Sequence, residues 1–243
     1  MTVALFGDSL MLPRGADLTG DGTGIPAEST YPALLESELS RATNGQVRAD
    51  GLRARTMPQL ERELSDAMLA GTTHAAIHIG IVDCAPRVFS IRQHGLVKRL
   101  PKPVRKWVVG LAHRNRRRII AARPMKVYTE LASYRASAAR IARRFRGAGI
   151  QTAFLSIAPP NEHFAFNSPG LTENVTRYNA ALRDMCREEQ ATYLDLHSKI
   201  LNVGISETLL KDGHHINFHG HRLVCDSLCE WLGLDTIESR EIN

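Results

Sequence analysis

The chain begins MTVALFGDSL over residues 1–10, and this stretch decides the fold. Residues 3–6 form a short apolar run that Gly7 follows at once, which is typical of a buried strand leading into a turn. In a parallel α/β sheet, functional groups gather at the carboxyl ends of the strands. Ser9 stands just after such an end, where a serine can be presented as a nucleophile. The triplet Gly-Asp-Ser alone is a weak signal, because it recurs by chance in many loops.

Strand-like and helix-like patterns alternate along the rest of the chain. Short apolar or β-branched runs predict the strands, at residues 3–6, 46–52, 74–79, 150–157 and 191–194. Apolar spacing and flanking proline or glycine predict the main helices, at residues 32–39, 58–69, 104–120, 127–145, 171–189 and 218–232. Five strands that alternate with helices indicate parallel βαβ units with helices on both faces of the sheet. We therefore expect one α/β domain over residues 1–243.

Length and composition fit a globular domain with a sizeable core. The chain has 243 residues, of which 43% are hydrophobic and 23% charged, and this balance argues against disorder. It has no run of about 18 apolar residues that could cross a membrane, and its first residues lack the basic region of a secretory signal. Its 4 cysteines form no CxxC pair, which is typical of buried thiols in a reducing compartment. We therefore expect a cytoplasmic protein.

Positive charge is concentrated between Asp83 and Glu130, although the whole chain has a formal net charge of only +6. The segment contains no acidic residue and these basic ones: Arg87, Arg92, Lys98, Arg99, Lys102, Arg105, Lys106, Arg114, Arg116, Arg117, Arg118, Arg123 and Lys126. It either attracts an anionic substrate, polymer or membrane surface, or is a solvated helical face without a partner. Nucleic acid is disfavoured, because few aromatic side chains are present for base stacking. We expect a mostly helical insertion over about residues 86–126.

A second polar block, KDGHHIN at residues 211–217, lies far downstream. A serine nucleophile needs a base within hydrogen-bond reach, and the base needs an orienting carboxylate. The Asp-x-x-His spacing places Asp212 and His215 on one turn, where the carboxylate can accept from one imidazole nitrogen while the other faces Ser9. The alternative is a polar loop before a helix, with Asp212 or Asn217 as its cap. The nearby histidines also suggest a metal, but they lack a familiar ligand spacing, so we expect no metal and no cofactor.

Together, the two blocks resemble the SGNH hydrolase superfamily, also called GDSL esterases. The chain opens with Gly-Asp-Ser-Leu after its first strand and closes with Asp-Gly-x-His before its last helix, and the resemblance extends over about residues 2–82 and 127–232. It implies a flavodoxin-like, three-layer α/β/α sandwich of about five parallel strands, with the basic insertion after the third strand. It also implies a catalytic triad of Ser9, His215 and Asp212 that hydrolyses or transfers an ester-linked acyl group.

The family's second block, which contributes to the oxyanion hole, matches less well. It offers a backbone N–H group, usually from glycine, and alignment on Thr56 puts Ala54 at that position. Alanine in place of glycine can still offer this N–H group, provided that the backbone angle φ is not forced positive. Gly51 is the second candidate for this role, and Asp8, beside the nucleophile, is a further candidate for the oxyanion or substrate-binding residues.

The third block, GIVDCAPR at residues 80–87, departs from the family pattern Gly-x-Asn-Asp. Val82 stands where the family has an asparagine whose side chain donates to the oxyanion, and loss of one such donor slows a reaction roughly 10²–10³-fold. Arg87 is the candidate substitute, or is only the first charge of the insertion, and Asp83 is expected to fix the loop. The block also resembles a divergent branch of the superfamily associated with bacterial surface polysaccharides, which implies an acidic glycan or a lipid-linked sugar pyrophosphate at the basic surface.

Three functions are compatible with these residues. The first is a serine esterase that removes an acyl group, expected to be acetyl, from a carbohydrate or related ester through an acyl-enzyme. The second is an acyltransferase that uses the same triad with a sugar hydroxyl in place of water. The third is a weakly active protein on an esterase scaffold that binds a polyanion or glycan. Val82 favours this last hypothesis, whereas the intact set of Ser9, Asp212 and His215 opposes it.

Overall fold

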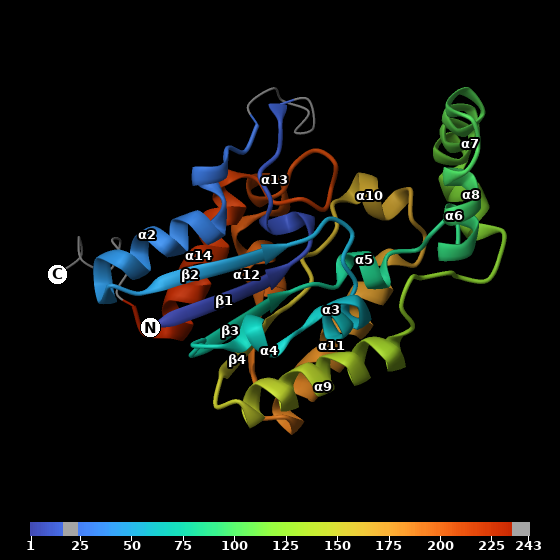
Figure 1. The fold of residues 1–243 in the computed structure, drawn as a ribbon. Coiled ribbons are helices and arrows are strands. Elements are labelled where there is room, and N and C mark those ends of the chain that lie inside the picture. The colour runs from blue at the N-terminus through green and yellow to red at the C-terminus, as the bar shows by residue number, and fades with distance from the viewer. Residues whose placement is uncertain (17–23, 235–243) are drawn as a thin grey trace.

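Five parallel strands form one sheet in the computed structural model, which describes residues 1–16 and 24–234 (Figure 1). The strands are β1 (Thr2–Gly7), β2 (Gln46–Gly51), β3 (His74–His78), β4 (Gln151–Leu155) and β5 (Thr192–Leu194). Their order across the sheet is β2-β1-β3-β4-β5, and every neighbouring pair is parallel. The predicted α/β class and the five parallel strands are therefore confirmed, and the carboxyl ends of all five strands lie along one edge.

Two layers of helices enclose this sheet (Figure 1). One layer contains α2 (Tyr31–Thr43), α12 (Leu196–Val203), α13 (Ile205–Thr208) and α14 (Phe218–Leu232). The other contains α3 (Met57–Glu63), α9 (Leu131–Gly147) and α11 (Leu171–Glu188). Short elements complete the described part: the 3-10 helices η1 (Ser9–Met11) and η2 (Ala27–Ser29), and the helices α4 (Asp66–Leu69), α5 (Ile81–Cys84) and α10 (Glu162–Phe166).

The central strands separate two apolar clusters, because successive side chains of a strand point to opposite faces. In β1, Val3 and Leu5 belong to the cluster under α2 and α14, whereas Ala4 and Phe6 belong to the cluster under α9 and α11. Both clusters consist of fully or nearly fully buried residues. This arrangement confirms the expected three-layer α/β/α sandwich.

Some predicted helix bounds are wrong, for reasons that lie in tertiary contacts. The helix expected at residues 58–69 is two helices, α3 and α4, because the backbone turns to an extended conformation at Leu64. The carbonyl of Leu64 instead accepts a 2.8 Å hydrogen bond from Arg144 of α9, which also pairs with Asp66. The helix expected from residue 127 begins at Leu131, after an extended Glu130.

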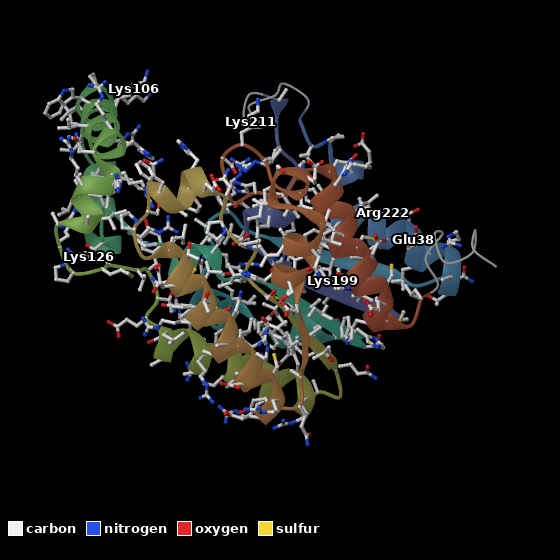
Figure 2. The ribbon with its side chains drawn as sticks, turned by 180° about the vertical axis from the view of Figure 1, so that it is seen from behind. Glu38, Lys106, Lys126, Lys199, Lys211 and Arg222 are labelled. Carbon is white, nitrogen blue, oxygen red and sulfur yellow. The ribbon has the colours of Figure 1, made fainter. Side chains whose placement is uncertain are left out.

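The basic segment forms a helical insertion between β3 and α9, as expected, and it projects from one end of the sandwich (Figure 1). Its helices are α6 (Ile91–Lys98), α7 (Lys102–Arg114) and α8 (Arg116–Ala121), so the single helix expected at residues 104–120 is divided at Asn115. Lys106 lies near its outer end and Lys126 near its base (Figure 2). At that base, the N–H group of Arg87 donates to the carbonyl of Lys126 at 2.8 Å.

Arg116 fastens the insertion to the sandwich. Its Nη2 donates to the carbonyl of Pro86 at 2.7 Å, and its Nε donates to Oγ of Ser168 at 3.0 Å. Farther out, Trp107 on α7 is 68% exposed.

The four cysteines are free and buried, in line with the expectation for them. Within residues 1–16 and 24–234, no helix combines the length and apolar character needed to cross a membrane.

Candidate active site

Ser9 lies where the first strand ends, as the first residue of η1. Gly7 makes this turn possible, because a Cβ atom there would lie 2.4 Å from Sδ of Met11. Oδ1 of Asp8 accepts a 2.9 Å hydrogen bond from the N–H group of Leu10 and so caps η1. Asp8 is 0% exposed and its side chain shapes this turn, and its part in binding a substrate stays a prediction.

His215 lies beside Ser9 although the two residues are far apart in the sequence. Nε2 of His215 lies 2.9 Å from Oγ of Ser9, and Nδ1 lies 2.7 Å from Oδ2 of Asp212. The loop that carries both residues runs between α13 and α14 and is closed by an isolated bridge between Leu209 and Ile216. The structure therefore brings together the three residues of the expected triad.

Several donors hold Asp212 in its charged form. Its Oδ1 accepts hydrogen bonds from the N–H groups of His214 at 3.2 Å and His215 at 3.1 Å, and Nη2 of Arg14 lies 3.8 Å from Oδ2. Partial burial alone would raise the pKa of Asp212, but the hydrogen bond with His215 and the charges of the two histidines outweigh it. The net result is a pKa well below the ordinary range, so this carboxylate accepts hydrogen bonds and does not donate them.

His214 occupies a different environment from His215. Its ring lies 4.9 Å from that of Phe164 and 4.0 Å from that of His215, measured between centroids. Burial, followed by repulsion from His215, lowers the pKa of His214 to about 4. Asp212, His214 and His215 also bring possible metal-ligand atoms within 4.8 Å of one another. Asp212 and His215 are already joined by a 2.7 Å hydrogen bond, and the expected absence of a metal stays a prediction.

The loop after β2 presents Ala54 in a left-handed conformation. Its φ is +60°, which strains alanine where glycine would not be strained, although the N–H group is present in either residue. The neighbouring Arg55 is anchored, because its buried guanidinium pairs with Asp50 and Glu63. Gly51 has a packing role, since a Cβ atom there would lie 2.8 Å from the side chain of Met11.

The third block lies on α5, directly after β3. Asp83 is fully buried and accepts from the N–H group of Met57 at 3.1 Å, so it ties this block to the start of α3. Burial raises the pKa of Asp83 to about 7. Val82 packs into the apolar cluster under α9. Arg87 lies beside both, with Nη2 donating to the carbonyl of Val82 at 2.9 Å and its guanidinium 4.3 Å from the ring centroid of Tyr128.

Three features near the triad carry no signal in the sequence. Arg14, in a loop rich in glycine and proline, lies beside Asp212. His221 is buried on α14, where Nδ1 accepts a 3.1 Å hydrogen bond from the N–H group of Tyr31. His78 is buried at the end of β3, and burial lowers its pKa to about 4. Only the fold reveals these neighbours, because they come from three separate segments.

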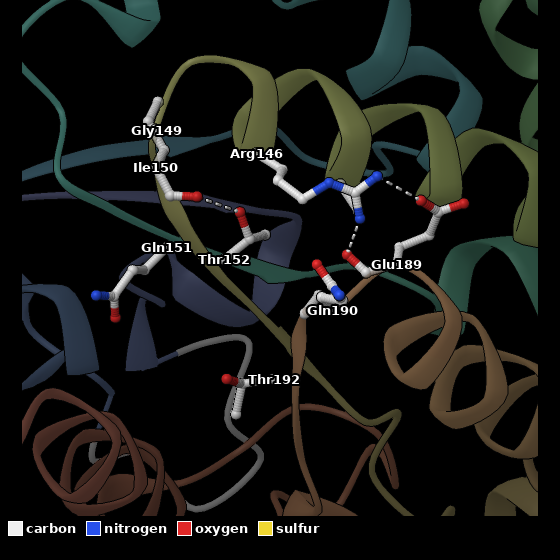
Figure 3. Close-up of a pocket in the computed structure, with 10 residues that line it drawn as sticks. Arg146, Gly149, Ile150, Gln151, Thr152, Glu189, Gln190 and Thr192 are labelled. Carbon is white, nitrogen blue, oxygen red and sulfur yellow. Dashed lines mark hydrogen bonds and ion pairs between the residues drawn. The ribbon is translucent and has the colours of Figure 1, made fainter.

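A hollow at the opposite edge of the sheet is remote from this chemistry (Figure 3). It has a volume of about 400 Å³ and lies at the amino ends of β4 and β5, where Gln151 and Thr192 begin the two strands. Arg146 pairs with Glu189 across its rim. Since Ser9 follows the carboxyl end of β1, this hollow has no part in the arrangement around the triad.

Comparisons with known proteins agree with the fold. The chain is similar to solved structures of an acetylxylan esterase from Geobacillus stearothermophilus (15% identity, TM-score 0.62, covering 96% of this chain and 94% of that one) and a lipase/acylhydrolase from Enterococcus faecalis (12%, 0.64, 96% and 97%). It is also similar to an α/β hydrolase enzyme from the metagenome of Lake Arreo, Spain (17%, 0.63, 97% and 96%). At these identities, the likeness shows the fold alone.

The sequence itself was compared in two further ways. The comparison with curated proteins found no match. The model of the GDSL-like lipase/acylhydrolase family matches residues 5–223, a range that includes Ser9, Asp212 and His215. The chain therefore belongs to the GDSL-like lipase/acylhydrolase family.

Proposed function

We propose that this protein is a serine hydrolase that removes an acyl group from an ester through a covalent acyl-enzyme. The observation that supports this is the continuous chain of hydrogen-bonding distances from Ser9 through His215 to Asp212, at 2.9 and 2.7 Å. Because the charged Asp212 can only accept, Nδ1 of His215 carries a proton. In the neutral imidazole, Nε2 is then left to accept the proton of the Ser9 hydroxyl.

The reaction follows from this arrangement. Oγ of Ser9 attacks the carbonyl carbon of the ester while Nε2 of His215 takes the hydroxyl proton. The carbonyl oxygen becomes an oxyanion, for which the backbone N–H groups of Ser9 and Ala54 are the proposed donors. His215 then returns the proton to the departing alkoxide, and the acyl group stays on Ser9. A water molecule repeats the attack with His215 as base, and the acid and the free enzyme are released.

The proposed substrate is an O-acylated carbohydrate, with acetyl as the acyl group. An acetylxylan esterase is among the similar structures, and the basic insertion beside the third block suits a polar, charged substrate. An acyltransferase would differ only in admitting a sugar hydroxyl in place of water. We propose that the insertion and the sandwich act as one domain and, from the buried free thiols, that the protein works in a reducing compartment such as the cytoplasm.

A fluorophosphonate probe tests this function. It should label the wild-type chain at Ser9, whereas Ser9→Ala should lose both labelling and hydrolysis of 4-nitrophenyl acetate. Ser206→Ala, which removes an exposed hydroxyl on α13, is the matched control and should keep both. Labelling or turnover that persists in Ser9→Ala would show that the nucleophile is assigned wrongly. Comparing acetate release with acetyl transfer to an added sugar distinguishes the hydrolase from the acyltransferase.

A further inference from the structure

A hollow of about 300 Å³ lies between the insertion and the second and third blocks. Its lining includes Ala54, the proposed oxyanion donor, and Arg87 from the third block. The insertion contributes Val109 and His113 of α7 and Arg116 at the start of α8. The hollow is therefore built partly by the sandwich and partly by the insertion, and Ala54, the proposed oxyanion donor, is part of its wall.

Two arginines, Arg87 and Arg116, line this hollow. None of the described residues that line it is acidic. The two positive charges are close enough to repel each other. Burial, and to a lesser extent the charge of Arg87, lowers the pKa of Arg116. The carboxylates of Asp8 and Asp83 also attract the positive charge of Arg87. Burial raises the pKa of each carboxyl to about 7, so near neutral pH they are only partly ionised and offset less of that charge.

The hydrogen-bonding groups of the two arginines are only partly used. Nη2 of Arg87 donates to Val82, whereas its buried Nε has no hydrogen-bond partner among the described residues. Nε and Nη2 of Arg116 fix the insertion to Ser168 and Pro86, and these bonds leave Nη1. A buried donor without a partner is costly, so a group that accepts from it gains free energy on binding. Guanidinium groups match carboxylate and phosphate oxygens in geometry and charge.

We propose that the Arg87–Arg116 hollow is an anion subsite, which binds a carboxylate or phosphate group on the sugar part of the acylated substrate. The inference rests on the proposed function, because it assigns the substrate class of the same site. An acidic sugar ester would place its charged group between the arginines while its acyl carbonyl lies at Ser9 and Ala54. A neutral ester would enter the same site without satisfying the arginines.

Binding without turnover tests the subsite independently of catalysis. Calorimetric titration with methyl glucuronoside, methyl glucoside and glucose 6-phosphate uses unacylated ligands that the triad cannot process. We expect the glucuronoside or the phosphate to bind at least roughly tenfold more tightly than the glucoside, because charge-assisted hydrogen bonds carry such differences. The better of the two charged ligands identifies the source of the anion. Equal binding of all three would overturn the proposal while leaving the hydrolase intact.

Two variants with the same change in net charge locate the effect. Val109→Glu places a carboxylate in the hollow beside the arginines. The variant should bind charged and neutral ligands about equally, so the roughly tenfold preference of the wild type for the charged ligand is lost. Lys106→Gln removes one charge from an exposed position on α7 outside this hollow, and it should keep both the preference and the rate on 4-nitrophenyl acetate. Val109→Gln controls for side-chain size.

Kinetics on acetylated methyl glucuronoside and acetylated methyl glucoside extends the test to the ester. The ratio of kcat/KM for the two esters should exceed about tenfold in the wild type and fall in Val109→Glu but not in Val109→Gln. An equal fall in Lys106→Gln would mean that general surface attraction, not the hollow, selects the charged ester. No hydrolysis of either ester, together with preserved selective binding, would contradict the proposed function and not the subsite.

Discussion

Replacing Asp8 by asparagine should change how stability depends on pH. Burial raises the pKa of Asp8 to about 7 from an ordinary 3.8, and this effect is only partly offset by the N–H group of Leu10 and the charge of Arg87. Between these two values the folded chain keeps the proton that the unfolded chain has lost. Unfolding therefore releases a proton, and the free energy of unfolding falls as the pH rises through this range.

The magnitude follows from the two pKa values. Each pH unit within the range costs up to about 1.4 kcal/mol, and less close to pH 7, so the carboxyl should remove roughly 2 kcal/mol of stability from the wild type between about pH 5 and about pH 7. Asparagine cannot ionise, and its Oδ1 can still accept from the N–H group of Leu10. The free energy of unfolding of Asp8→Asn should therefore not fall in this way. Relative to the wild type, it should rise by the same amount over the same pH range.

Urea unfolding at several pH values measures the difference. Other buried groups also titrate here, with Asp83 acting in the same direction and His78 and His221, whose pKa values are lowered by burial, in the opposite one. Because the variant retains all of them, the difference between wild type and Asp8→Asn reports the titration of Asp8 together with its effect on the pKa of Asp83. Asp184→Asn, on the exposed face of α11, is the matched control. A difference between wild type and Asp8→Asn that stays constant from about pH 5 to about pH 8 would refute the reasoning.

Four further substitutions address the site and its support. Asp212→Asn should lower kcat on 4-nitrophenyl acetate roughly 10³–10⁴-fold, because an amide holds the wrong tautomer of the imidazole, and an unchanged rate would exclude the carboxylate from the reaction. Ala54→Gly should stabilise the chain by about 0.5–1 kcal/mol in urea by relieving the left-handed backbone, and a loss of stability would contradict this. Val82→Asn should destabilise by about 1–3 kcal/mol without raising kcat, because it buries an amide in an apolar cluster; a faster variant would show that position 82 does reach the oxyanion. Tyr134→Phe should cost about 1 kcal/mol by removing the 3.1 Å hydrogen bond to the Ile79 carbonyl, and calorimetry that finds no shift in Tm would count against that bond.

The strands and the two outer blocks could be predicted because their signals are local. The apolar run that ends at Gly7 fixes both the first strand and the place of Ser9 after it. The Asp-x-x-His spacing likewise puts Asp212 and His215 in one loop, where a short turn is enough to join them. What the sequence could not supply is the distance between the two blocks, which depends on how the intervening sheet brings them together.

Other features depend on partners that are distant in sequence. The division of α3 from α4 depends on Arg144, which is 80 residues away from Leu64. Ala54 gives no sign of its left-handed backbone, because alanine is a residue that favours helices, and only its neighbours impose the conformation. That Arg116 lines the same hollow as Arg87 is equally hidden, since the sequence does not distinguish Arg116 from the other basic residues of the insertion.

The hydrogen bond between the Arg87 N–H group and the Lys126 carbonyl bears on how this enzyme could diversify. It joins the two ends of the insertion at its base. The insertion is therefore attached to the sandwich in the same way whatever the length or sequence of the helices between these ends. Doubling the length of such a loop costs only about 0.6 kcal/mol in closure entropy. Selection could therefore lengthen, shorten or recharge the intervening helices with little penalty to the sheet. The insertion, with the proposed anion subsite, and the proposed triad on the sandwich are therefore free to evolve at different rates.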